Sequence, residues 1–280
     1  TTLSIDRRQR QMCIRDRWEV AGAVEGVALR HGGRLSFPII CSKHGETLHN
    51  HHYDNVLEAG DLVVLDTGGV SPSGYAGDIT RTLPIGGRFD DRQRAIYELV
   101  LDAEVRSVDA VRPGITDREV HLNACRILAE GLRALWLMKG EPAEAVDAGA
   151  HALFMPHGLG HMMGLDVHDA EGLDETYAGY GSEMKRSEQF GLASLRLGRT
   201  LEEGFVLTVE PGIYLIPALI DRWQADGRHT SFIDYEELES WKDFGGVRIE
   251  DDVVVTAAGH RVLGEPIPKA PADVESLLAQ

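Results

Sequence analysis

Four carboxylates in or beside strand-like segments, two in each half of the chain, constrain the fold most. Asp66 follows the run LVVL, and Asp78 comes twelve residues later in GYAGDITRTL. Glu210 follows LTV, and Glu250 follows VRI. Strand-like apolar runs predict a buried face, where carboxylates are out of place and repel one another unless a cation lies between them. We therefore expect a fold that brings these four side chains into one cavity.

Asp66 also opens the triplet Asp-Thr-Gly, which is typical of aspartic proteases. Those enzymes need two such loops, because one carboxylate must hold the proton that its partner lacks. Only one triplet occurs here, so we reject this interpretation. A simple turn would account for Asp66 alone. If segments 62–67 and 75–82 pair as neighbouring strands, however, Asp66 and Asp78 can point into the same cavity.

His161 adds a nitrogen ligand to this set, which together would carry a charge of about −4. Two divalent cations would neutralise it. Carboxylates with one imidazole suit Mn²⁺ or Co²⁺, with Zn²⁺ as an alternative and Mg²⁺ less suitable. Histidines elsewhere support a polar site, since eight of the twelve lie in the windows 44–52 and 151–168.

The composition limits the possible partners and the compartment. The 45 acidic and 28 basic residues give a net charge of −17, which disfavours binding to nucleic acid or to an acidic membrane surface. No apolar run is long enough to span a membrane. The cysteines, Cys13, Cys41 and Cys125, are few and scattered, which indicates a reducing, cytoplasmic location without disulfides. A hydrophobic content of 43% is enough for a substantial core.

The pattern of elements predicts an α+β fold with an antiparallel sheet. Apolar spacing and caps predict helices over 18–30, 90–111 and 116–135, the last with a capping box of Thr116 and Glu119. Strands are expected within 35–42, 61–68, 74–83, 204–216 and 245–259, with a helical insertion over 217–242. Residues 1–17 hold five arginines, and their MCIRDR resembles a translated sequencing adapter. We therefore expect an unstructured or artefactual leader over 1–17 and one catalytic domain over 18–280.

Four stretches in order carry a family resemblance: LDTGG…GYAGDITRTLP, MPHGLGHMMGLDVHD, LTVEPGIY and GGVRIEDDVVVT. Together they resemble the proline-specific metallopeptidases Xaa-Pro aminopeptidase (aminopeptidase P) and Xaa-Pro dipeptidase (prolidase). The resemblance implies the pita-bread (creatinase/aminopeptidase) fold, a curved antiparallel sheet with helices on its outer face. It also implies a dinuclear-metal exopeptidase, most consistent with Mn²⁺, that hydrolyses Xaa-Pro bonds at the N-terminus of peptides or in dipeptides.

The resemblance assigns a role to each expected ligand. Asp66 matches the ligand of one metal, and Asp78 and Glu250 match the bridging carboxylates. His161 and Glu210 match the ligands of the second metal. Glu210 is also our candidate for relaying a proton to the leaving imino nitrogen of proline.

Further roles implied by the resemblance concern catalysis and the substrate. His168 matches the histidine that contacts the scissile peptide and stabilises its oxyanion, and His157 matches a substrate-site histidine. Arg248 matches the arginine that orients the metal carboxylates. Arg196 matches the prolidase arginine that grips the carboxylate of a dipeptide, and an exposed arginine is the alternative.

His49 lies seventeen residues before Asp66, where the family places another active-site histidine that contacts the substrate. Its neighbours His51 and His52 leave the choice among the three open.

Several alternatives remain open from the sequence. Methionine aminopeptidase shares the five ligands and the fold, a non-catalytic binding protein could retain the fold, and creatine hydrolysis would use the same scaffold. Family members usually carry an N-terminal domain that is missing here, so we expect a complete metal site with impaired activity. We also expect a homodimer. The sequence does not decide between a dipeptidase and an aminopeptidase, although Arg196 favours the former.

Overall fold

The computed structural model describes residues 17–182 and 184–279. Residues 1–16 of the expected leader lie outside this range, whereas Arg17 is the first residue of helix α2 (Arg17–Arg30) and donates a hydrogen bond to the Cys41 carbonyl (2.9 Å). Within the described residues, no helix is both long and apolar enough to cross a membrane.

Two three-stranded antiparallel sheets form the framework. The first has the order β2 (Ile40–Ser42), β3 (Leu62–Thr67), β5 (Ile79–Pro84), and the second has the order β10 (Gly259–Val262), β9 (Asp251–Thr256), β6 (Val206–Val209). Two-stranded antiparallel pairs join β1 (Arg34–Leu35) to β4 (Gly69–Val70) and β7 (Gly212–Tyr214) to β8 (Gly246–Arg248). The expected α+β class with antiparallel sheets is confirmed.

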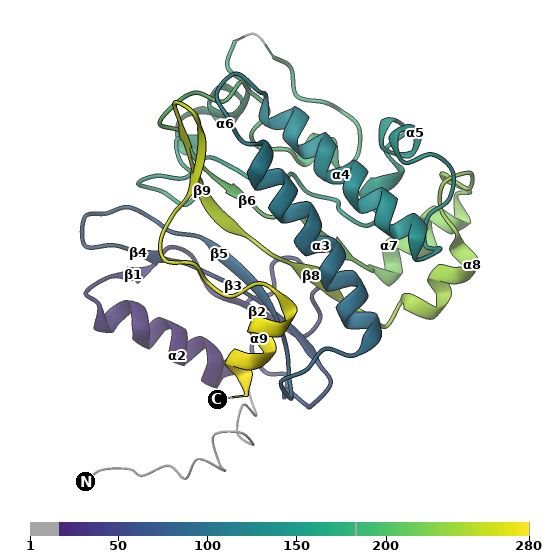
Figure 1. The fold of residues 1–280 in the computed structure, drawn as a ribbon, viewed down its shortest axis with the longest axis horizontal. Helices are drawn as coiled ribbons and strands as arrows, with labels where there is room; N and C mark the ends of the chain where they lie inside the picture. Colours follow the sequence, from purple (N-terminus) through teal and green to yellow (C-terminus); the bar gives the residue numbers. More distant parts are fainter. Residues whose placement is uncertain (1–16, 183, 280) are drawn as a thin grey trace.

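Strand β5 connects the two halves of the chain. The backbone N–H of Glu250 donates to the Thr80 carbonyl (3.1 Å). The hydroxyl of Thr82 donates to the Arg248 carbonyl (2.9 Å) and accepts from the Arg248 N–H (3.1 Å). Figure 1 accordingly shows β5 beside the yellow-green β8 and β9, although about 160 residues separate them in sequence.

Two long helices cover one face of these strands (Figure 1). They are α3 (Asp91–Ala110) and α4 (Asp117–Ala134), and both begin with a complete capping box. In α4 the Thr116 side chain accepts from the Glu119 N–H while the Glu119 carboxylate accepts from the Thr116 N–H, as the sequence predicted. Their apolar faces pack into the main core with strands β6, β7, β8 and β9.

The remaining helices are short and lie mostly around the rim of the strands. They are α5 (Pro142–Asp147), η1 (Ala150–Leu153), α6 (Glu171–Tyr180), η2 (Leu192–Ser194), α7 (Pro217–Ala225), α8 (Tyr235–Leu238), η3 (Glu239–Trp241) and α9 (Pro271–Leu278). The helical insertion expected over 217–242 therefore consists of three short helices.

Two predicted strands differ from the observed ones. The segment 35–42 is interrupted around Pro38, and its two ends pair with β4 and β3 in different sheets. Proline cannot donate a ladder hydrogen bond, which explains a change of partner at this point. The segment 74–83 becomes a strand only at Ile79, because Ser71 to Tyr75 form a tight turn in which Gly74 has φ +92°.

Candidate metal centre

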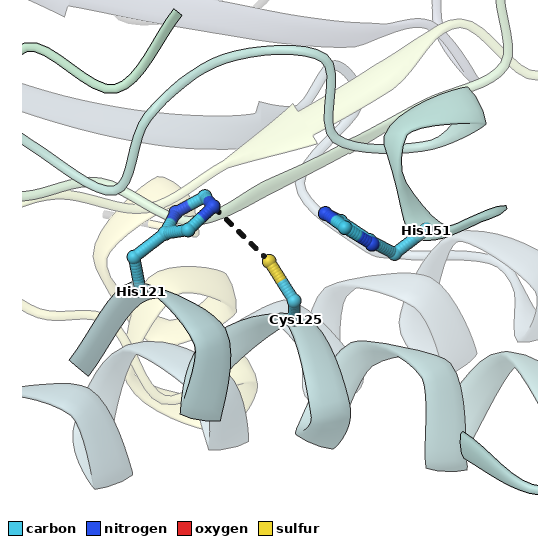
Figure 2. A group of neighbouring side chains, drawn as sticks. All are labelled: His121, Cys125 and His151. Carbon is cyan, nitrogen blue, oxygen red and sulfur yellow. Dashed lines mark hydrogen bonds between the residues drawn. The ribbon is translucent and has the colours of Figure 1, made fainter. Parts of the chain in front are cut away.

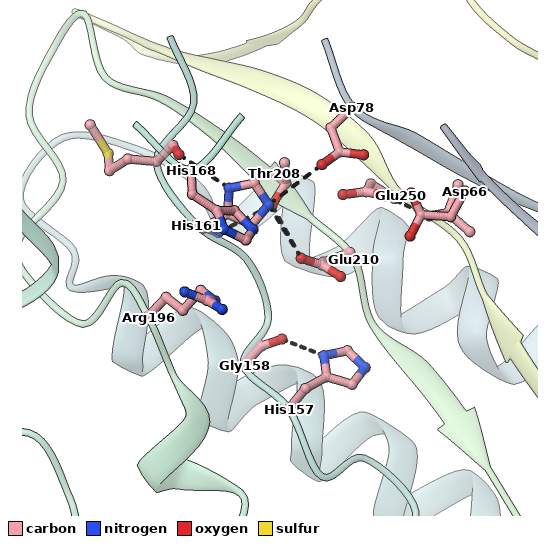
Figure 3. Close-up of polar contacts among 12 residues, drawn as sticks. Asp66, Asp78, His157, Gly158, His161, His168, Arg196, Thr208, Glu210 and Glu250 are labelled. Atoms are coloured by element: carbon pink, nitrogen blue, oxygen red, sulfur yellow. Dashed lines mark hydrogen bonds and ion pairs between the residues drawn. The ribbon is translucent and has the colours of Figure 1, made fainter. Parts of the chain in front are cut away.

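The five expected ligand side chains converge where the strands of the two halves meet (Figure 3). Asp66 lies on β3, opposite Thr80 of β5, so Asp78 just before β5 lies close to it. Glu210 directly follows β6, and Glu250 directly precedes β9. The pairing of the Asp66 and Asp78 segments expected from the sequence is therefore confirmed.

The distances are short enough for one ion or a pair of ions to contact these groups together. His161 Nε2 lies 3.5 Å from Asp78 Oδ2 and 3.8 Å from Glu210 Oε1. One ligand atom each of Asp78, His161 and Glu250 lies within 4.8 Å of the others. Asp78 and Glu250 are buried at the bottom, with 7% and 1% of their surface exposed.

The His161 ring is oriented by its surroundings. Its Nδ1–H donates to the Met162 carbonyl (3.1 Å), which leaves Nε2 directed at the carboxylates. The His161 backbone N–H donates to the Thr208 hydroxyl (3.1 Å), so strand β6 fixes the loop that carries the ring. A hydrogen bond on the second ring nitrogen is the usual way in which a ligating histidine is held.

Arg248 lies at the centre of a buried network around the carboxylates. Its Nη2 donates to Asp66 Oδ2 (2.5 Å), its Nη1 to the Tyr214 hydroxyl (2.9 Å) and its Nε to Thr80 Oγ1 (3.2 Å). Thr80 Oγ1 in turn donates to Glu250 Oε2 (2.5 Å). One guanidinium therefore positions two of the carboxylates, directly for Asp66 and through Thr80 for Glu250.

The electrostatics of this cluster favour cation binding. Burial raises the pKa of Asp78 to about 8, and Asp66 raises it further. Burial also raises the pKa of Glu210 to about 7 and that of Glu250 well above its usual range. Each shift reflects the cost of placing negative charges together away from water, and a bound divalent cation would remove that cost.

The polar atoms without partners point to the same conclusion. Asp66 Oδ1, Asp78 Oδ1 and Asp252 Oδ1 are buried and lack hydrogen-bond partners. Buried carboxylate oxygens are normally paired, and an ion is one way to satisfy them. The donor set of carboxylates and one imidazole therefore fits hard to borderline divalent cations.

A pocket of about 100 Å³ opens above the carboxylates. The substrate-side residues predicted from the sequence all line this pocket: His49, His157, His168 and Arg196. Asp66, His161, Glu210 and Arg248 line it as well. His51 and His52 are not among the lining residues. The structure thus favours His49 over its two neighbours as the histidine that faces the pocket.

The pocket histidines differ in how they are held. His157 is engaged at both nitrogens, with Nδ1 2.7 Å from the Gly158 carbonyl and Nε2 2.9 Å from the Tyr214 hydroxyl. The His168 ring packs edge-on against His161, with centroids 4.3 Å apart. Burial lowers the pKa of both His157 and His168 to about 4, so both rings are neutral near pH 7.

Arg196 is not a free exposed arginine. Its Nη1 donates to Glu171 Oε2 (2.6 Å), and its side chain is 38% exposed at the pocket wall. Glu171 also lies 3.7 Å from His168 Nδ1. Glu171 thus holds Arg196 beside His168, at the opposite side of the site from Asp78 and Glu250 (Figure 3).

Sequence analysis missed four residues that support the site: Thr80, Thr208, Tyr214 and Asp252. Asp252 accepts a hydrogen bond from the Asp78 N–H (3.1 Å), and burial raises its pKa to about 7. Each of the four lies within two to four residues of an expected ligand. That proximity was the available signal, but it does not show which neighbours point inward.

Comparisons with known proteins agree with this geometry. The model of metallopeptidase family M24 matches residues 10–257. Human Xaa-Pro dipeptidase is 37% identical over 94% of this chain and 53% of its own length. A probable Xaa-Pro aminopeptidase of Verticillium alfalfae is 39% identical over 83% of this chain and 48% of its own length. Aminopeptidase P from Escherichia coli with the inhibitor Pro-Leu has a TM-score of 0.75 and 34% identity, covering 97% of this chain and 55% of that chain.

The match starts at residue 10, within the segment expected to be a leader. The chain spans about half the length of the curated relatives it matches. The structural likeness to aminopeptidase P confirms the expected pita-bread fold. From the family match over most of its length, and from sequence identities above 30%, the chain belongs to metallopeptidase family M24.

Proposed function

We propose that this chain carries the catalytic centre of a metal-dependent exopeptidase that hydrolyses the Xaa-Pro bond at the N-terminus of peptides or in dipeptides. The observation that carries this proposal is the convergence of Asp66, Asp78, His161, Glu210 and Glu250 from both halves of the chain below one pocket. The relatives named Xaa-Pro dipeptidase and Xaa-Pro aminopeptidase support the choice of substrate.

We assign these five side chains to two divalent cations, with Asp78 and Glu250 shared between them. Asp66 would complete the ligand set of the first cation. His161 and Glu210 would complete that of the second. Bound divalent ions would supply Lewis-acid polarisation of the carbonyl and activation of a water molecule. We expect Mn²⁺ to be preferred, with Co²⁺ or Zn²⁺ as substitutes, because oxygen ligands outnumber nitrogen and sulfur is absent from the set.

Glu210 is the proposed proton carrier. Its side chain is 20% exposed and lines the pocket, so it can reach both the metal centre and a bound substrate. The leaving nitrogen of proline is tertiary in the peptide, so it must be protonated before it can depart. Glu210 would deliver that proton.

The pocket wall supplies the remaining groups. Neutral His168 would donate an N–H to the oxyanion, and a donor of this kind contributes about 3 kcal/mol in other enzymes. His49 and His157 would shape the substrate site, and Arg248 would hold the carboxylates in place. Arg196 would bind the free carboxylate of a dipeptide, which requires exchange of its contact with Glu171.

An assay with four peptides tests this function and separates it from the alternatives. Ala-Pro, Gly-Pro, a longer Xaa-Pro-Xaa peptide and Met-Ala-Ser are each incubated with and without Mn²⁺, and creatine is incubated in parallel. Cleavage of the Xaa-Pro bonds only with metal supports the proposal. Cleavage of Met-Ala-Ser alone would identify a methionine aminopeptidase. Metal binding without hydrolysis of any peptide, or hydrolysis of creatine instead, would reject the proposal in favour of a binding protein or a creatine hydrolase.

We also propose a cytoplasmic homodimer whose catalytic domain is the segment 18–280. The net charge of −17 argues against nucleic acid as a partner, because phosphate binding needs an excess of basic residues. The chain has a mass of 30.7 kDa, so light scattering of a dimer should give about twice this value. A monomer mass would reject the dimer without affecting the proposed chemistry.

A further inference from the structure

A second group of metal-binding side chains lies apart from the carboxylate centre. His121 and Cys125 stand one turn apart on the same face of α4, and His151 approaches from η1. Figure 2 shows the Cys125 sulfur between the two imidazole rings. One ligand atom from each side chain lies within 4.8 Å of the other two. This is the same closeness that Asp78, His161 and Glu250 show in the carboxylate centre.

The three side chains are buried with few interactions of their own. His121 and Cys125 are fully buried, and His151 is 3% exposed. Both ring nitrogens of His151 and Nδ1 of His121 lack hydrogen-bond partners. Leaving such groups unpaired costs about 1–3 kcal/mol each. The His151 ring in particular has no hydrogen-bond partner at either nitrogen, and an ion held with Cys125 and His121 Nε2 would engage one of them.

The imidazoles are in the form that binds metals. Burial lowers the pKa of His121 to about 3 and that of His151 to about 4, so both rings stay neutral. A backbone group of Val146 near the His151 ring opposes part of this shift. Burial raises the pKa of Cys125 to about 12, so the sulfur is a thiol until a cation displaces its proton.

The spacing of the donor atoms fits a tetrahedral ion. Zn–S bonds of about 2.3 Å and Zn–N bonds of about 2.0–2.1 Å at tetrahedral angles place sulfur and nitrogen roughly 3.5–3.6 Å apart. The distance from Cys125 Sγ to His121 Nε2 is 3.5 Å. A weak thiol–imidazole hydrogen bond has the same length, but it leaves His151 without a partner.

We propose that His121, Cys125 and His151 form a second metal site, specific for a thiophilic cation and best suited to Zn²⁺. A thiolate and two imidazoles are softer ligands than the carboxylates of the first centre, so the two sites would select different ions. Binding of Zn²⁺ would release the Cys125 proton to solvent. The fourth position would be open or held by water.

Asp117 is the acidic group that would balance the charge of such a site. A Zn²⁺ ion with one thiolate retains a net charge of +1 in the core. Asp117 lies one turn before His121 on α4, about 6 Å along the helix, and is fully buried with both carboxylate oxygens unpaired. Burial alone raises its pKa well above the usual range, and a cation nearby would favour its ionised form.

The site would hold the loop that leads to the carboxylate centre. His151 lies in η1, six residues before His157 and ten before His161. A cation bridging η1 to α4 would therefore fix the start of this loop and stabilise the folded chain.

Cobalt substitution of the full chain tests the proposal. The protein is expressed with Co²⁺ in the medium, so that ions can enter during folding. Absorption by a thiolate-to-cobalt charge-transfer band then reports a sulfur ligand. None of the five carboxylate-centre ligands is a cysteine, so that centre cannot produce the band. We expect the band in the wild type and one more equivalent of cobalt than in Cys125→Ser.

Cys41→Ser is the matched control, because Cys41 is equally buried but lies on β2. It should keep the band, as should Cys13→Ser. If Cys125→Ser fails to fold, His151→Gln gives a second test, with the band shifted or lost and one equivalent of cobalt missing. The proposal is overturned by a wild type that lacks the band while its carboxylate centre holds cobalt. It is equally overturned by a band that persists in folded Cys125→Ser. Neither result affects the proposed peptidase activity.

Discussion

The substitution Thr80→Val tests how the carboxylate centre is supported. Thr80 is fully buried, and its hydroxyl connects two charged side chains by donating to Glu250 and accepting from Arg248. Valine keeps the shape of threonine and removes the hydroxyl. The hydrogen bond from Thr80 lowers the pKa of Glu250, which burial holds well above its usual range. Without this bond, Glu250 is harder to ionise, and protons compete better with metal.

The size of the effect follows from the loss of one hydrogen bond to an ionised group. Such a bond contributes about 1.5–3 kcal/mol. If Thr80→Val removes this contribution from the metal-bound form alone, the dissociation constant of Mn²⁺ rises roughly 10- to 150-fold. This agrees with the 10- to 100-fold losses that are typical when a partner of a ligand is removed.

Calorimetric titration of the chelator-stripped protein with Mn²⁺ near neutral pH measures the change. Thr80→Ser keeps the hydroxyl and should bind close to wild type. Thr82→Val is the matched control, because Thr82 is equally buried on β5 but bonds to the backbone of Arg248 and not to Glu250. An unchanged Mn²⁺ affinity in folded Thr80→Val would refute the relay from Arg248 to Glu250.

Three further predictions concern charge. Burial raises the pKa of Asp78 to about 8 and those of Glu210 and Asp252 to about 7, so the folded metal-free chain holds protons that the unfolded chain releases above about pH 4. Below about pH 6.5 the buried neutral histidines His121, His151, His157 and His168 oppose this effect, because the unfolded chain protonates them first. The free energy of unfolding should therefore fall between about pH 6.5 and 8. Saturating Mn²⁺ should reverse this slope, and urea unfolding at several pH values measures both. Asp78→Asn should lose bound metal in elemental analysis and also lose the Asp78 contribution to that slope; normal metal content would contradict its bridging role. Arg196→Ala should raise KM for Gly-Pro roughly 10- to 150-fold by loss of a charge-assisted hydrogen bond. It should leave a longer Xaa-Pro-Xaa peptide unaffected, and equal losses on both substrates would contradict the carboxylate-binding role.

The positions of the carboxylates could be predicted because a charge at the end of an apolar run is physically expensive. That argument singled out Asp66, Glu210 and Glu250, and the expected pairing of segments 62–67 and 75–82 added Asp78 to them. The long helices could also be predicted from the sequence, since the capping box of Thr116 and Glu119 marks the start of α4. These features depend on nearest neighbours in the chain or on one strong energetic penalty.

Other features depend on contacts that no local pattern encodes. The strand expected over 74–83 begins late because a turn at Gly74 intervenes, and alternation of side chains does not reveal where pairing starts. Thr80 and Tyr214 look like ordinary strand residues, yet both bond to the Arg248 side chain, Thr80 from another sheet and Tyr214 from the neighbouring strand β7. The group of His121, Cys125 and His151 was also missed, because only the packing of η1 on α4 brings His151 to the other two.

The joining of β5 to β8 and β9 has a consequence for synthesis on the ribosome. Asp66 and Asp78 leave the exit tunnel long before Glu210 and Glu250, so a nascent chain first presents two acids without the rest of their site. The centre can be completed only after β9 has emerged and docked on β5. Divalent metal would thus stabilise the last step of folding, the docking of β8 and β9 on β5. Without metal, the helices would form but this contact between the two halves would stay accessible to proteases.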